Sequence, residues 1–145
     1  MTKKKAAPSL SMFDTVAASN KGKRVELLTL SRELSGVFIS ILGTDSDESV
    51  KYRRQQRDYM NRKIMLARKR GQELSLDSAE VSEEKEIDLL VRMTTGWENM
   101  PKFEEDGVGL LEFSKENAAL LYARFPSIKR QLDEEAGDMQ DFTTG

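Results

Sequence analysis

The sequence predicts a mainly α fold of the α+β class, made of an N-terminal β-hairpin, a long basic helix and a small helical C-terminal lobe. Three observations predict it. An apolar, β-branched run lies between glycines at 36–43, a polar stretch at 45–70 has helix signals at both ends, and apolar residues recur at helical spacing between 82 and 137. The 145 residues are enough for one small domain or two very small lobes.

Both ends of the chain and one internal segment lack the apolar residues that a packed element needs. Residues 1–23 are rich in Lys, Ala and Ser, and we expect them to be flexible apart from one short docking turn. We also expect a linker at 72–81 and a flexible tail at 138–145. The apolar side chains available to the docking turn are Leu10, Met12, Phe13 and Val16.

The segment 24–42 has the pattern of a β-hairpin. Its second half alternates, which places Val37, Ile39 and Ile41 on one face. Two strands alone are marginally stable in water. We therefore expect the hairpin to pack on helices or to join another strand.

The segment 45–70 predicts one long helix, which together with the hairpin makes a unit at 24–71. Residues 45–48 offer N-capping side chains and first-turn acids, and Gly71 follows a basic last turn. Tyrosine and leucine side chains give this helix only a thin apolar stripe.

Charge is strongly sorted along the chain. Residues 51–70 contain nine Lys or Arg and one acid, whereas residues 72–106 contain eleven acids and three Lys or Arg. We expect the basic helix to pair with acidic surfaces of this chain, of a second copy or of another protein. Binding to nucleic acid is the disfavoured alternative, because no recognised nucleic-acid-binding motif accompanies the basic residues.

The segment 82–137 predicts the helical lobe. Ser82 opens a first helix that ends near Trp97, Ser114 caps a second helix, and Pro126 starts a third. An acidic connection containing Pro and Gly separates the first two helices. The large side chains expected at the centre of the lobe are Trp97, Phe113, Leu121, Phe125 and Ile128.

Composition argues against an enzyme. The chain has no His and no Cys, which removes the usual general base, the thiol nucleophile and the commonest zinc ligands. A partial calcium-loop pattern begins at Asp45, but Val50 replaces its glycine and Gln56 its distal glutamate. We expect no catalysis, no metal and no cofactor. No apolar run approaches the ~20 residues of a membrane span, so we expect no membrane partner.

Two groups of residues are candidates for partner binding. The basic helix interleaves arginines with aromatic rings, a combination that suits acidic protein surfaces or, in the alternative, phosphates and bases. A second group combines adaptable methionines with aromatic rings, and is either the core of the lobe or a groove for a partner helix. The two groups are Tyr52, Arg53, Arg54, Arg57 and Tyr59, and Met93, Trp97, Met100 and Phe103.

Several motifs occur in a distinctive order in the second half of the chain. A Thr-Gly-Trp motif at 95–97 precedes an Asp-Gly turn at 106–107, then a Phe-Ser-Lys-Glu-Asn segment at 113–117, and finally the helix that starts at Pro126. The first half has a hairpin, a Gly-Thr-Asp-Ser turn and a helix rich in Tyr and Arg. Over residues 24–142 the chain resembles the tail assembly chaperones of long-tailed, siphovirus-like bacteriophages.

The resemblance implies a non-enzymatic assembly factor. It would bind the tape-measure protein, keep that protein soluble and help to recruit the major tail (tube) protein while the tail tube polymerises. It would act in the cytoplasm of the infected bacterial host and be absent from the mature virion, and self-association would fit this role. Two alternatives stay open: a small nucleic-acid-binding phage regulator that uses residues 51–70, and a structural tail subunit.

Overall fold

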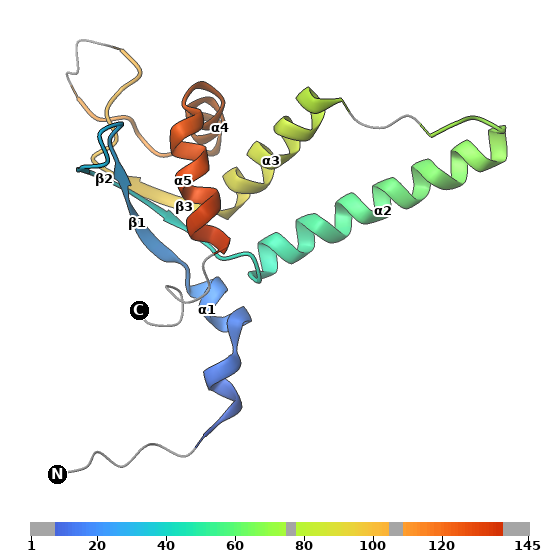
Figure 1. The fold of residues 1–145 in the computed structure, drawn as a ribbon, viewed down its shortest axis with the longest axis horizontal. Helices are drawn as coiled ribbons and strands as arrows, with labels where there is room; N and C mark the ends of the chain where they lie inside the picture. The colour runs from blue at the N-terminus through green and yellow to red at the C-terminus, as the bar shows by residue number, and fades with distance from the viewer. Residues whose placement is uncertain (1–7, 75–77, 105–108, 138–145) are drawn as a thin grey trace.

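The structure is a computed structural model that describes residues 8–74, 78–104 and 109–137. The fold is mainly α with one small antiparallel sheet, as predicted (Figure 1). In chain order the elements are a 3-10 helix η1 (Leu10–Phe13), α1 (Thr15–Lys21), β1 (Lys23–Leu28), β2 (Leu34–Ile41), α2 (Asp47–Arg70), α3 (Ala79–Met93), β3 (Thr94–Glu98), α4 (Lys115–Arg124) and α5 (Pro126–Gly137).

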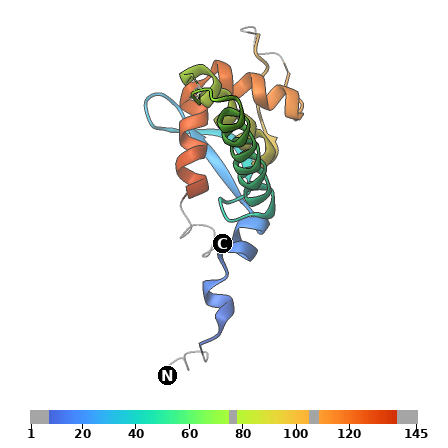
Figure 2. The same ribbon diagram turned by 90° about the vertical axis from the view of Figure 1, so that its right-hand side faces the viewer.

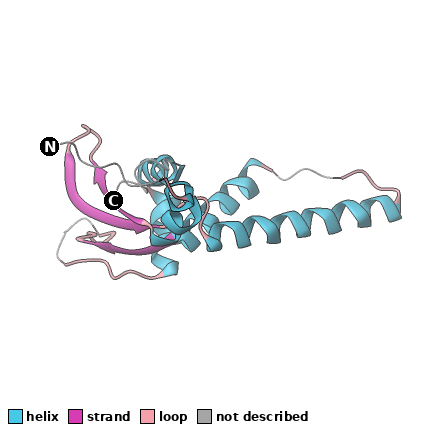
Figure 3. Cartoon of the chain, turned by 90° about the horizontal axis from the view of Figure 1, so that it is seen from below, coloured by secondary structure: helices cyan, strands magenta, loops and turns pink. Residues whose placement is uncertain are grey.

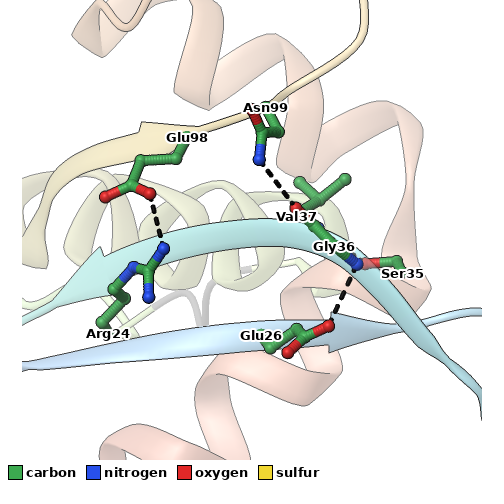
Figure 4. A network of polar contacts seen from close by, with 7 residues as sticks. All are labelled: Arg24, Glu26, Ser35, Gly36, Val37, Glu98 and Asn99. Carbon is green, nitrogen blue, oxygen red and sulfur yellow. Dashed lines mark hydrogen bonds and ion pairs between the residues drawn. The ribbon is translucent and has the colours of Figure 1, made fainter.

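The predicted hairpin is confirmed, and it acquires a third strand. The strand order is β1-β2-β3, with Ile39 opposite Val25 on one side and opposite Trp97 on the other. Ile39 and Ile41 are fully buried, as their alternation predicts. The opposite face of the sheet carries polar contacts between strands. There, Arg24 of β1 donates to Glu98 of β3 (Figure 4).

The third strand corrects the prediction that a helix runs to about Trp97. Helix α3 ends at Met93, and Thr94 is already extended, with φ −81° and ψ 124°. Two β-branched threonines and a tryptophan favour extended backbone, and the free edge of β2 supplies the hydrogen-bond partners. The C-terminal lobe is therefore not purely helical.

One buried cluster holds the hairpin and the C-terminal helices together. It draws on β1, β2, α3, α4 and α5, and Tyr122 of α4 is its largest fully buried side chain. Of the expected lobe centre, Leu121 is buried, while Phe125 remains 39% exposed. Trp97, Phe113 and Ile128 are partly buried and pack against the cluster from outside. Side chains of β1 and β2 form part of the buried cluster instead of these three.

The N-terminal segment contains a helix that the sequence analysis did not predict. Helix α1 lies within the stretch expected to be flexible, and its Ser19 is fully buried against Gly43. The side chain of Asn20 also accepts a bond from Asp47 N at 2.8 Å. The four side chains of the expected docking turn are exposed, and η1 buries none of its residues. Residues 1–7 and 138–145 lie outside the described part of the chain.

Serine side chains set the helix starts. Ser46, not Asp45, caps α2, and Ser78 caps α3, so that helix begins at Ala79 within the expected linker rather than at Ser82. Ser114 caps α4 as predicted. At the other end, α2 stops at Arg70 as predicted, and Gly71 after it takes the left-handed conformation, with φ 63°.

Helix α2 projects from the body as an arm, and α3 returns towards the body from the direction of its tip (Figures 1 and 3). The two helices touch near the body. There Tyr52 donates its hydroxyl to Lys85 O at 3.1 Å, and Arg92 bonds Gln55 at 3.3 Å. The outer part of α2 is thereby left to solvent.

Candidate interaction surfaces

The first group of predicted partner-binding residues divides between the base of α2 and its outer part. Tyr52 is only 4% exposed, and its ring lies under the Arg92 guanidinium at 4.8 Å, so it fastens α2 to α3. Arg53 donates to Thr44 O at 2.7 Å and fixes the turn before α2. Burial removes Tyr52 from the predicted contact surface, whereas Arg53 stays exposed and its assignment remains a prediction.

The outer part of α2 carries the exposed cations. We call residues 54–70 the basic arm. Arg54 and Arg57 are exposed, and the ring of Tyr59 is 49% exposed, with Lys63 and Lys85 ammonium groups each 5.8 Å from its centroid. Exposed apolar side chains at Met65 and Leu66 accompany them. The basic arm thus combines positive charge with apolar contact area.

The guanidinium groups of the basic arm do not pair with the acids of α3 among the described residues, so α3 is not the acidic surface that the charge sorting predicts. The acids of α3 pair elsewhere: Asp88 with Arg92 of the same helix, and Glu86 with Lys129 of α5. The reason is geometric, because the two helices diverge away from the body (Figure 1).

The second predicted group is mostly core. Met93 and Met100 are 3% and 2% exposed and belong to the buried cluster, which is the core alternative of the prediction. Trp97 is half-buried, donates its indole N–H to Leu111 O at 2.8 Å, and packs edge-on against Phe113 with ring centroids 5.0 Å apart. Trp97 therefore organises the connection between β3 and α4.

Phe103 and the buried Met100 line one accessible pocket. The pocket holds about 220 Å³ and lies where the hairpin end, the connection after β3 and the α4–α5 junction meet. The rings of Phe103 and Phe125 lie parallel there, 6.5 Å apart. We call this pocket the apolar groove; its lining includes Leu27, Val37, Met100, Phe103, Leu121, Phe125 and Ile128.

The apolar groove escaped sequence analysis because its walls come from three distant segments. A bond from Leu111 N to Met100 O at 2.7 Å, together with the Pro101–Leu110 bridge, holds the connection that carries Phe103. The only advance signal was the adaptable Met and Phe pair itself. The rest of the lining follows from tertiary packing.

The perturbed ionisable groups of the described residues serve the fold. Burial raises the pKa of Tyr122 to about 12. Burial also lowers the pKa of Lys115, and Glu48 opposes that shift. Lys115 Nζ donates to Val91 O at 2.9 Å and Thr94 O at 2.6 Å, which satisfies carbonyls at the end of α3. Within the described ranges, no three metal-ligating side chains come together.

Comparison of the chain with protein-family models, curated proteins and solved structures finds no match. Of the helices that the structure describes, none has the length and apolar character required to cross a membrane. The residues and their geometry therefore carry the functional argument.

Proposed function

We propose that this chain is a tail assembly chaperone of a long-tailed bacteriophage. It binds the tape-measure protein, keeps it soluble and helps to recruit the major tail protein, acting without catalysis in the host cytoplasm and leaving before the virion is complete. The observation that carries the proposal is the basic arm, whose exposed guanidinium groups form no ion pair with α3 in the part of the chain that the structure describes. The order of motifs along the chain supports the same function.

The chemistry of the basic arm suits a long helical client. Exposed apolar groups at Tyr59, Met65 and Leu66 supply contact area for packing against another helix. The arginines favour a client helix with acidic side chains. Each exposed ion pair contributes only ~0.2–1 kcal/mol, so binding must be collective and must weaken as salt is added.

The test is a charge reversal on the arm with a matched control. Arg54→Glu/Arg57→Glu removes two cations of the arm, whereas Arg32→Glu/Arg130→Glu makes the same change in net charge at exposed positions on the body. Each protein is co-expressed with the tape-measure protein, and the soluble tape-measure protein that co-purifies is measured. We expect the arm variant to recover much less of it than the control. Equal recovery with both variants would contradict the proposal.

The exposed guanidinium groups of the arm also favour a second candidate, the nucleic-acid-binding regulator. For a protein that grips duplex phosphates, the logarithm of affinity falls with the logarithm of salt concentration, with a slope of about −0.9 per phosphate contact. A titration of the unmodified chain with duplex DNA at several salt concentrations separates the two functions. Micromolar DNA binding at physiological salt, lost in Arg54→Glu/Arg57→Glu, would favour the regulator.

A structural tail subunit is the remaining alternative. It differs from the chaperone because it stays in the mature virion. Mass spectrometry of purified virions distinguishes the two. The chaperone is expected only in infected-cell lysate, whereas a structural subunit would be present in virions in stoichiometric amounts.

A further inference from the structure

The N-terminal turn η1 presents large apolar side chains to solvent. Leu10 and Phe13 are 87% and 75% exposed. In a 3-10 helix, side chains at i and i+3 eclipse each other, so these two point to the same side. We call the pair the peg. Burying such side chains releases about 1.5–3 kcal/mol each, which makes their exposure costly unless something covers them.

The peg is held on a supported element. Asp14 accepts a hydrogen bond from Ala17 N at 2.9 Å and so caps α1 directly after the peg. Helix α1 is in turn pinned to the turn before α2, where Gly43 N donates to Ser19 O at 2.9 Å. The described N-terminal segment leads away from the body in both views (Figures 1 and 2).

The apolar groove lies at the opposite end of the sheet from the peg. Strand β1 starts at Lys23, next to α1, and ends at Leu28, which lines the groove. Six residues of strand span about 20 Å. While α1 stays docked, the peg of a chain is therefore directed away from the groove of that same chain.

The groove matches the peg in size and chemistry. A dry cavity of about 150 Å³ accepts a benzene ring, so the groove's volume of about 220 Å³ accommodates one phenyl ring and an aliphatic neighbour. Pockets for drug-sized ligands are larger, about 300–1,000 Å³. The charges beside the two surfaces are also complementary, because exposed Asp14 directly follows the peg and Lys102 lines the groove.

We infer that the peg of one copy of this chain inserts into the apolar groove of a second copy. If both peg–groove pairs of a dimer form, the dimer is two-fold and closed. If only one pair forms, one peg and one groove stay free, and repetition of the contact gives open chains or larger rings. The inference uses neither the basic arm nor the client proposed for it.

Sedimentation velocity over a wide range of protein concentration tests the inference. We expect the mean mass of the unmodified chain to rise with concentration. The peg variant Leu10→Asp/Phe13→Asp and the groove variant Phe103→Asp should each bind at least tenfold more weakly. Leu120→Asp changes an equally apolar, 59% exposed side chain away from both surfaces and should associate normally. Circular dichroism checks each fold, and Phe125→Asp replaces the groove variant if that variant unfolds.

A mixing experiment identifies the geometry of the contact. The peg variant keeps an intact groove and the groove variant keeps an intact peg, so an equimolar mixture should form dimers and nothing larger. An unmodified chain that stays monomeric, a peg variant that associates normally, or a mixture that stays monomeric would each overturn the inference. The arm variant Arg54→Glu/Arg57→Glu should still self-associate, so this inference and the proposed function can fail separately.

Discussion

The phenol hydroxyl of Tyr122 lies 2.6 Å from the hydroxyl oxygen of Thr94, inside the buried cluster. Thr94 donates its own proton to Leu90 O at 2.7 Å, so it accepts from Tyr122. This pair joins α4 to the point where α3 becomes β3. Neither the residue types nor their spacing in the sequence predicts this hydrogen bond.

Replacing Thr94 should lower the free energy of unfolding more than replacing Tyr122. In Tyr122→Phe, Thr94 keeps its bond to Leu90 O, and the loss should be about 1 kcal/mol, the usual net value of a neutral hydrogen bond. In Thr94→Val the buried phenol loses its acceptor, and the cost should be about 1–3 kcal/mol. Urea unfolding measures both. Thr94→Ser is the control, because it keeps the hydroxyl, and a larger loss in Tyr122→Phe than in Thr94→Val would contradict this account.

Stability should fall in alkaline solution because of Tyr122. Burial raises the pKa of Tyr122 to about 12 from an ordinary value of 10.0, so the folded state favours the neutral phenol. The stability that the neutral phenol contributes is complete below pH 10 and is lost as the pH rises towards 12. Two pKa units correspond to about 2–3 kcal/mol.

Urea unfolding between pH 9 and about 12 in three proteins isolates this effect. Tyr122→Phe should have a flatter dependence on pH than the unmodified chain, and Tyr59→Phe, which changes a half-exposed ring, should not. The lowered pKa of Lys115 acts in the opposite sense and is common to all three proteins. Identical slopes for Tyr122→Phe and the unmodified chain would refute the assignment.

Gly43→Ala should loosen α1 from the body. A Cβ atom at position 43 would lie 2.4 Å from Ser19 Oγ and 3.0 Å from Ser19 Cα, so the helix must shift. Overpacking of this kind costs about 1–3 kcal/mol. Hydrogen exchange should show faster exchange in α1, while the sheet stays protected. Gly96→Ala is the control, since nothing lies within 4 Å of its added Cβ atom, and unchanged protection of α1 in Gly43→Ala would rule out the close contact.

Trp97→Phe should destabilise the connection after β3 more than it destabilises the core. The variant keeps an aromatic ring for Phe113 but loses the indole bond to Leu111 O. We expect a loss of about 1 kcal/mol, typical of one hydrogen bond, and faster amide exchange at Leu111. A loss of several kcal/mol, as for removal of a fully buried ring, would mean that Trp97 is part of the core.

The sequence alone predicted the elements whose signals are local. The apolar alternation that ends at Ile41 gave the hairpin and its buried face, and Ser114, Pro126 and Gly71 marked helix ends. A capping hydroxyl, a proline ring or a left-handed glycine acts within a few residues of itself, so its effect can be read from its neighbours. For the same reason the exposure of Arg54 and Arg57, on a helix with few apolar residues, followed from the sequence.

Tertiary structure decided the rest. Residues 94–98 are a strand because β2 offers an open edge, and Met93 and Met100 are buried because the hairpin packs on the C-terminal helices. The apolar groove exists only where Leu27, Phe103 and Ile128 meet, three residues that are far apart in the sequence. Local propensity differs by ~1 kcal/mol or less between helix and strand for most residues, so long-range burial and edge pairing outweigh it at such places.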